Sequence, residues 1–167
     1  MKVKDVMKMD VGFCLAEDSL MKAAEIMRHR DCGVVPIVDD ERRVIGMLTD
    51  RDLCLAIVAR NRKASDVQTK DLIRSEPIVC AADDKIESVL RKLRKNQIKR
   101  LAVVGAIGEL VGIVSVSDIL LGIRKDKNLK KKTYATLKAV AKPRSIVLRE
   151  ISVDEDTLFP ADKINLS

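Results

Sequence analysis

The stretch Gly46-Met47-Leu48-Thr49-Asp50-Arg51-Asp52 decides how the rest of the sequence is interpreted. A second copy follows 66 residues later as Gly112-Ile113-Val114-Ser115-Val116-Ser117-Asp118. Each copy has glycine, two apolar residues, a hydroxyl residue, two variable positions and aspartate. Apolar runs flank both copies, so each predicts a strand that ends in a polar turn and leads into a helix. Thr49 and Ser115 are the expected N-caps, with the aspartates in the first helical turn.

These residue types also suit a ligand. A hydroxyl group beside unpaired helical N–H groups can hold a phosphate, and a carboxylate can accept hydrogen bonds from the two hydroxyls of a ribose. The same residues can instead be helix caps and nothing more, because such caps are common. The motif considered by itself leaves both interpretations open.

The repeat extends without a gap from residue 5 to residue 57. Apolar residues at helical spacing recur in both copies: Leu20, Ala23, Ala24 and Met27, then Ile86, Val89, Leu90 and Leu93. Strands are expected at 33–38, 44–48, 101–104 and 110–114. Pro36 lacks an N–H, so it should lie at the beginning or the edge of its strand. Two small halves should pack around a pseudo-two-fold axis, with the twin motifs at opposed ends of one shared cleft.

Composition excludes several classes of protein. Phe13, Tyr134 and Phe159 are the only aromatic residues, which argues against a stacking platform for single-stranded nucleic acid. The four cysteines show no C-x-x-C spacing and are expected to be reduced packing residues, not metal ligands. Neither a signal peptide nor a membrane span is recognisable, so a cytoplasmic location is expected. His29 is the sole histidine, and no set of residues suggests catalysis.

Positive charge is concentrated in one segment. Residues 1–123 carry a net +2, residues 124–144 carry +8, and residues 145–167 carry −3. The apolar positions of 124–144 favour a basic helix that Pro143 ends, followed by a weak strand pattern at 145–151 and an acidic end. A solvated surface, contact with nucleic-acid phosphates, and docking onto a protein partner are the alternatives for this tail.

Residues 1–123 resemble a CBS-domain pair, also called a Bateman module. The resemblance rests on the two motifs in register, on the order of elements, and on Val35-Pro36-Ile37-Val38-Asp39. It implies an α/β (α+β) fold of tandem repeats, each a small β-sheet packed on two helices. The implied division is 1–60 for the first repeat, 61–70 for a linker, 71–123 for the second repeat and 124–167 for the tail.

The resemblance also implies a regulatory adenine nucleotide between the halves. Asp52 and Asp118 would hold ribose hydroxyls, Thr49 and Ser115 would contact phosphate, and Ser117 could add a hydroxyl. The positions that would line or flank the base are Val35, Pro36, Leu101, Ala102, Phe13, Cys14, Val79 and Cys80. Ala102 departs from the family, which often has proline there.

An anionic ligand also needs positive charge near the cleft. Arg51, Lys99 and Arg100 are the candidates, because arginine pairs with phosphate in a forked geometry. Ordinary solvated surface charge is the equally simple alternative for these three residues.

The expected function is therefore a non-catalytic ligand sensor. It would bind AMP, ADP, ATP or S-adenosylmethionine and signal to an unidentified effector, and family members usually form homodimers. Two other readings stay open at this stage: a nucleic-acid-associated protein that acts through the basic tail, and a structural scaffold whose cleft is empty.

Overall fold

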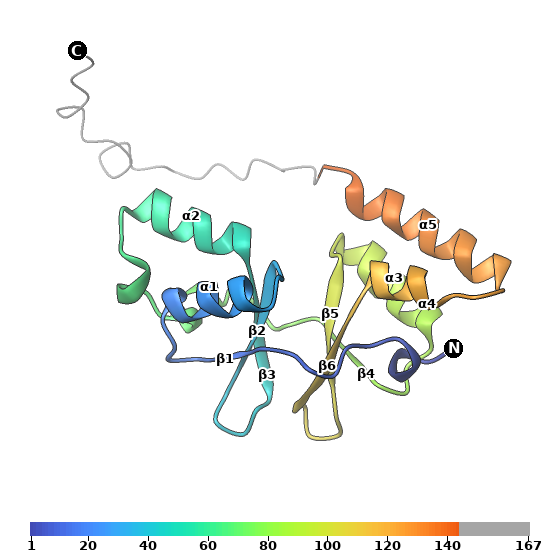
Figure 1. The fold of residues 1–167 in the computed structure, drawn as a ribbon, viewed down its shortest axis with the longest axis horizontal. Coiled ribbons are helices and arrows are strands. Elements are labelled where there is room, and N and C mark those ends of the chain that lie inside the picture. The colour runs from blue at the N-terminus through green and yellow to red at the C-terminus, as the bar shows by residue number, and fades with distance from the viewer. Residues whose placement is uncertain (144–167) are drawn as a thin grey trace, which may run out of the picture.

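The computed structural model describes residues 1–143, which form two similar halves side by side (Figure 1). The first half contains β1 (Cys14–Leu15), α1 (Leu20–His29), β2 (Val34–Val38), β3 (Val44–Thr49) and α2 (Asp50–Arg60). The second half contains β4 (Val79–Ala81), α3 (Ile86–Asn96), β5 (Arg100–Val104), β6 (Leu110–Ser115) and α4 (Val116–Gly122). Helix α5 (Lys127–Ala141) follows, and three short 3-10 helices are η1 (Val3–Asp5), η2 (Ala64–Asp66) and η3 (Thr69–Leu72).

Each half has one three-stranded mixed sheet. The orders are β1-β2-β3 and β4-β5-β6, with the first pair of strands parallel and the second pair antiparallel. Even the irregularities repeat, because the antiparallel register shifts at Ile37/Val38 in one half and at Val103/Val104 in the other. The expected α/β fold of two related repeats is confirmed.

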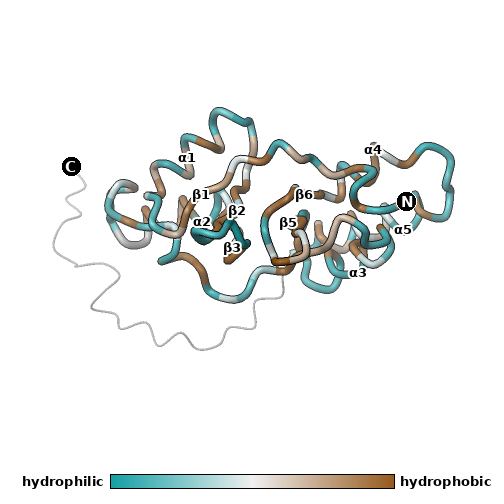
Figure 2. The backbone as a smooth tube through the Cα atoms, turned by 90° about the horizontal axis from the view of Figure 1, so that it is seen from below, coloured by the Kyte–Doolittle hydropathy of each residue, from teal (hydrophilic) through white to brown (hydrophobic). Residues whose placement is uncertain are grey.

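Each half buries its own aliphatic core. All four stripe residues of α3 are buried, whereas in α1 the buried ones are Leu20, Ala23 and Met27, and Ala24 is exposed. Figure 2 shows the corresponding hydrophobic colouring of β5 and β6 at the centre of the molecule. Aliphatic burial at about 25 cal/mol per Å² is the main stabilising contribution that this sequence offers.

Pro36 lies in the middle of β2, which is the central strand of its sheet. The prediction that it lies at the beginning of its strand or on an edge strand is therefore wrong. The reason is local. The N–H of Ala16 donates to the carbonyl of Val38 at 3.1 Å, so alternate residues of β2, including Pro36, face the β1 side. Strand β1 pairs only with Ile37 and Val38. The missing N–H therefore points where no strand continues, which is a local edge.

The halves exchange their first segments. Val3 is fully buried in the core of the second half, and its N–H donates to the carbonyl of Asp84 at 3.0 Å. Thr69, the repeat equivalent of Val3, is fully buried in the first half and donates its hydroxyl to the carbonyl of Leu15 at 2.7 Å. Residues 64–70 were expected in a polar linker and residues 71–72 at the start of the second repeat, but both segments complete the first half, and residues 1–8 complete the second.

Charge also ties the N-terminal segment to the second half. Hydrogen bonds from Lys4 and Lys2 lower the pKa of the exposed Asp83 carboxyl from 3.8 to about 2. A lowered pKa in the folded state stabilises the fold above the unfolded pKa of about 4, and this stabilisation is lost as the pH falls through about 2. We expect a ¹³C-detected titration of the Asp83 carboxyl to give a midpoint near 2 in the folded protein. Asp83→Asn should flatten the acid limb of stability, and a midpoint near 4 would contradict the contact.

The halves meet through an apolar cluster and through their hairpins. Val38, Ala102 and Leu110 are buried there, packed against partly buried side chains that include Phe13, Met47 and Val79. The hairpin after β2 pairs with the hairpin after β5: the N–H of Val44 donates to Gly108 at 3.0 Å, and the N–H of Leu110 donates to Arg42 at 2.9 Å. The bridge Arg43–Glu109 joins equivalent residues, so the pseudo-two-fold axis passes beside this pair.

Helix α5 confirms the basic helix expected before Pro143, and it packs on α3 and α4. The strand expected at 145–151 and the acidic end lie outside the described residues. Within residues 1–143, none of the helices combines the length and the apolar character that crossing a bilayer requires.

Candidate functional site

The first twin motif forms a capping box at the N-terminus of α2. The hydroxyl of Thr49 accepts from the N–H of Asp52 at 3.2 Å, and Oδ2 of Asp52 accepts from the N–H of Thr49 at 3.0 Å and from its hydroxyl at 2.6 Å. The N-cap role predicted for Thr49 is confirmed. Oδ1 of Asp52 accepts no hydrogen bond from the described residues, so it is free to bind a ligand hydroxyl.

The second motif repeats this geometry at the N-terminus of α4. The hydroxyl of Ser115 accepts from the N–H of Asp118 at 3.1 Å and donates to its Oδ2 at 2.5 Å. Ser115 is therefore the N-cap, as predicted. Oδ1 of Asp118 lies 3.6 Å from Nζ of Lys8, which reaches across from the exchanged N-terminal segment. Capping and ligand binding do not exclude each other, since each aspartate uses one carboxylate oxygen for the cap.

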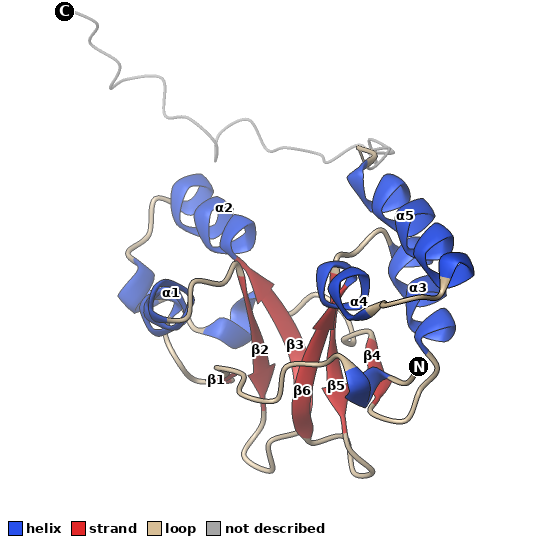
Figure 3. Cartoon of the chain, turned by 45° about the vertical axis from the view of Figure 1, so that its right-hand side comes forward, coloured by secondary structure: helices blue, strands red, loops and turns tan. Residues whose placement is uncertain are grey.

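Both motifs lie at the edge of the molecule opposite the hairpins, where α2 and α4 rise from β3 and β6 on either side of the division between the halves (Figure 3). In the first half the N–H of Asp50 donates to the carbonyl of Gly33 at 3.3 Å, and in the second the N–H of Val116 donates to Lys99 at 3.0 Å. Equivalent strand residues thus adjoin each helix N-terminus.

The two sites differ in charge. Beside the first aspartate stand Asp50 and Arg51, both exposed, and the carboxylate of Asp50 covers Gly33. Beside the second stand Ser117 and the cations Lys99 and Arg100, with Arg100 directly paired to Ser115 across the strands. Arg51 therefore adjoins the first motif, and Lys99 and Arg100 adjoin the second, as their places in the sequence predict.

The positions proposed to line the base are Val35, Pro36, Leu101 and Ala102. All four are buried, and β2 and β5 place them next to the strands that lead into the twin motifs. Ala102 also belongs to the apolar cluster between the halves, whereas Val35 and Leu101 are buried in the cores of their own halves. The side chain of Ala102 thus faces the division between the halves, whereas Val35 and Leu101 have only backbone groups to offer there.

Cys14 and Cys80 point away from the division between the halves. Each thiol is buried in the core of its own half, and burial raises the pKa of each to about 11. Their neighbours Phe13 and Val79 face the other half instead. The two cysteines can flank a ligand only through their main chain.

This burial predicts the order of thiol modification. Near neutral pH, iodoacetamide should modify the exposed Cys54 well before Cys14 and Cys80, because alkylation requires a thiolate that the solvent can reach. Peptide mapping by mass spectrometry should find Cys14 and Cys80 modified only after denaturant is added. Rapid modification of either in the folded protein would contradict the assignment.

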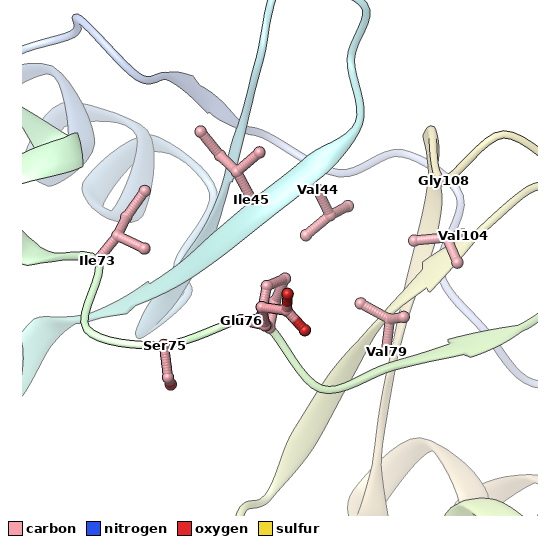
Figure 4. Close-up of a pocket in the computed structure, with 9 residues that line it drawn as sticks. Val44, Ile45, Ile73, Ser75, Glu76, Val79, Val104 and Gly108 are labelled. Atoms are coloured by element: carbon pink, nitrogen blue, oxygen red, sulfur yellow. The ribbon is translucent and has the colours of Figure 1, made fainter.

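A cavity of about 520 Å³ lies between the halves, near the hairpin end of β3 (Figure 4). Its lining is mostly aliphatic, with Ser75 and Glu76 as polar exceptions; the other residues are Val44, Ile45, Ile73, Pro77, Val79, Val104 and Gly108. Its volume suits a small ligand. Neither Asp52 nor Asp118 lines it, because Val44 and Thr49 lie at opposite ends of a strand of about 17 Å.

The two halves differ in an ion pair at the position of this cavity. Before β1, Asp10 pairs at 2.8 Å with Arg30, the C-cap residue of α1, and so links this loop to the end of the helix. The repeat equivalents are Glu76 and Asn96, which cannot form that ion pair, and the loop 75–77 lines the cavity instead. Of the cavity residues, the sequence had pointed only to Val79, and it had not pointed to Lys8, although the change from Arg30 to Asn96 was visible in the repeat.

Catalytic machinery was not expected from the sequence. Within residues 1–143, no three His, Cys, Asp or Glu side chains gather into a group that could hold a metal ion. Enzymes among the related sequences align with this chain over 23% of their own length.

Comparison with known proteins identifies the family of this chain. The CBS domain family matches residues 3–59 and 69–125. The uncharacterized protein YlbB of Bacillus subtilis is 31% identical over 121 residues, which cover 72% of this chain and 80% of YlbB.

Solved structures agree with this match. The crystal structure of Hypoxic Response Protein I with two coordinated zinc ions superposes with a TM-score of 0.69 at 29% identity, covering 74% of this chain and 100% of that one. The CBS domain pair of protein MJ0100, in complex with 5′-methylthioadenosine and S-adenosyl-L-methionine, superposes with a TM-score of 0.63 at 27% identity, covering 71% and 96%. The chain belongs to the CBS-domain family, as a tandem CBS pair followed by helix α5.

Proposed function

We propose that this protein is a non-catalytic sensor that binds an adenosine-type nucleotide at its twin motifs and signals to a partner. The observation that carries the proposal is the repeated pair of a capped hydroxyl and a half-buried aspartate, each aspartate with one oxygen outside the cap. The adenosyl ligands of the MJ0100 pair support the same ligand class.

The charge difference between the motifs ranks the two sites. The second motif adjoins Lys99 and Arg100 and has a neutral residue, Val116, where the first has Asp50. A nucleotide phosphate at the first site would meet Asp50 and Asp52, with Arg51 as the nearest cation in sequence. The second site therefore suits a phosphate-bearing nucleotide such as AMP, and the first suits an adenosyl ligand without phosphate.

The joint between the halves offers a route for the signal. Besides the exchanged segments, the halves meet through a small apolar cluster and two hairpin hydrogen bonds beside the cavity, so a ligand that prefers one arrangement can shift the halves about this contact. Exposed Leu55, Val58 and Leu121 on α2 and α4 provide apolar surface for a second copy of the chain. Light scattering on the purified protein should then give twice the monomer mass, and a monomer at high concentration would exclude the homodimer.

Calorimetry tests the proposal directly. The full chain should be titrated with AMP, ADP, ATP, S-adenosylmethionine and 5′-methylthioadenosine, after circular dichroism has established that it is folded. Heat of binding from at least one ligand is expected. If none of the five ligands gave a heat of binding, a structural scaffold without a ligand would be the better explanation of the protein's function.

A further inference from the structure

The structure joins two basic segments that are distant in sequence. Helix α3 of the second half packs against α5, and Figures 1 and 3 draw the two helices side by side. Residues 86–96 and 124–143 together carry 12 basic and 2 acidic side chains, a net +10. Residues 1–143 as a whole carry +9, so the rest of the described chain sums to −1. The excess positive charge of the folded protein thus resides on this helix pair and the residues next to α5.

A cationic groove lies along α3. A cavity of about 550 Å³ separates this helix from the residues that precede and open β4, and four of its lining side chains are basic: Arg91, Lys92, Arg94 and Lys95. Lys92 is held by the carbonyl of Val79 at 2.9 Å and by Asp84 at 3.6 Å. The other three are exposed and make no ion pair with the described residues. The groove therefore presents at least three cations to a ligand outside the protein.

Helix α5 adds cations but no free apolar face. Its side chains Leu129, Thr133 and Thr136 are buried against the second half. The exposed remainder is dominated by lysines: Lys127, Lys130, Lys131, Lys132 and Lys138. A helix that inserts into a bilayer surface needs an apolar face for the acyl region. Since that face of α5 is already used inside the protein, a membrane is a poor occupant.

The chemistry of the surface narrows the polyanion. Single strands are held by stacking of bases on aromatic rings, and Tyr134 is the one aromatic residue on either helix. Cations without stacking groups fit the regularly spaced phosphates of a double helix, which needs no base contact. An α5 of 15 residues spans about 22 Å, so several phosphates lie within its reach.

We propose that the exposed cations of the α3–α5 pair, Arg91, Arg94 and Lys95 of α3 and Lys127, Lys130 and Lys131 of α5, together bind the phosphate backbone of double-stranded nucleic acid without reading its sequence. This role is separate from the nucleotide site. It extends the basic tail to a composite surface, to which α3 contributes half of the named charges.

Fluorescence anisotropy with a labelled duplex of 20 base pairs and mixed sequence tests this surface in the full chain. With about six phosphates contacted, affinity should fall on the order of 1000-fold between 50 and 200 mM salt. Two charge-reversed variants are compared: Arg91→Glu with Arg94→Glu and Lys95→Glu, and Lys127→Glu with Lys130→Glu and Lys131→Glu. Each should weaken binding at least about tenfold at low salt and reduce the salt slope.

The matched control reverses three exposed cations elsewhere, Lys22→Glu, Lys63→Glu and Arg74→Glu, which change the net charge equally. It should weaken duplex binding much less than either variant, and circular dichroism establishes that all three proteins fold. Equal losses in all three would reduce the effect to net charge and overturn the proposal. Three other results would also overturn the proposal. They are a loss of duplex binding in the α5 variant alone, tighter binding to single strands than to the duplex, and preferential binding to anionic lipid vesicles.

Discussion

Asp118→Asn is expected to weaken AMP binding by about 10- to 100-fold, because each hydrogen bond from a ribose hydroxyl to a charged carboxylate contributes about 1.5–3 kcal/mol. Asparagine keeps a carbonyl oxygen that can accept from the N–H of Ser115, so the cap of α4 survives. Calorimetry with AMP measures the loss, and the thermal midpoint should change little.

Asp52→Asn is the matched control within the same chain. It removes the equivalent carboxylate from the equivalent capping box of the first motif, where Asp50 already disfavours a phosphate. AMP affinity should change less than twofold, whereas affinity for 5′-methylthioadenosine should fall. If both variants lost AMP equally, the charge ranking of the sites would be wrong; if neither lost any ligand, the twin motifs would be caps alone.

Val3→Asp is expected to lower the free energy of unfolding by about 3 kcal/mol or more, because it places a carboxylate in an apolar core without a partner. Val3 is fully buried in the second half although it opens the chain. Hydrogen exchange read by mass spectrometry should therefore show loss of protection in α3, β6 and α4, with less change in α1 and β3.

Met9→Asp is the control, since Met9 lies in the same segment but is 75% exposed. It adds the same charge near the same place and should leave both the unfolding midpoint and the exchange pattern nearly unchanged. Loss of protection mainly in the first half after Val3→Asp would contradict the exchange of segments.

Helix α5 changes how the basic tail is understood. As sequence, residues 124–144 were a charge run with three possible uses. In the structure, the buried side of α5 packs against α3 and α4, which brings its lysines to the same helix pair as the basic residues of α3. Because of this packing, the proposed polyanion surface includes residues of both helices and is distinct from the proposed adenosine site. Either proposal can therefore be wrong without affecting the other.

The sequence by itself determined the elements, the repeat and the family. A hydroxyl three residues before an aspartate at the start of an apolar helical stripe specifies a capping box through local backbone geometry, so Thr49 and Ser115 were recognisable as caps. Stripes such as Ile86, Val89 and Leu93 likewise needed only helical periodicity.

Only the tertiary structure decided which half each connecting segment completes, because burial of Val3 and Thr69 depends on contacts distant along the chain. It also decided that Cys14 and Cys80 turn inward while Phe13 and Val79 face the other half, since the two-residue alternation of a strand does not say which face meets which layer. The cavity beside Glu76 and the approach of Lys8 to Asp118 arise from the same long-range packing, which no local pattern encodes.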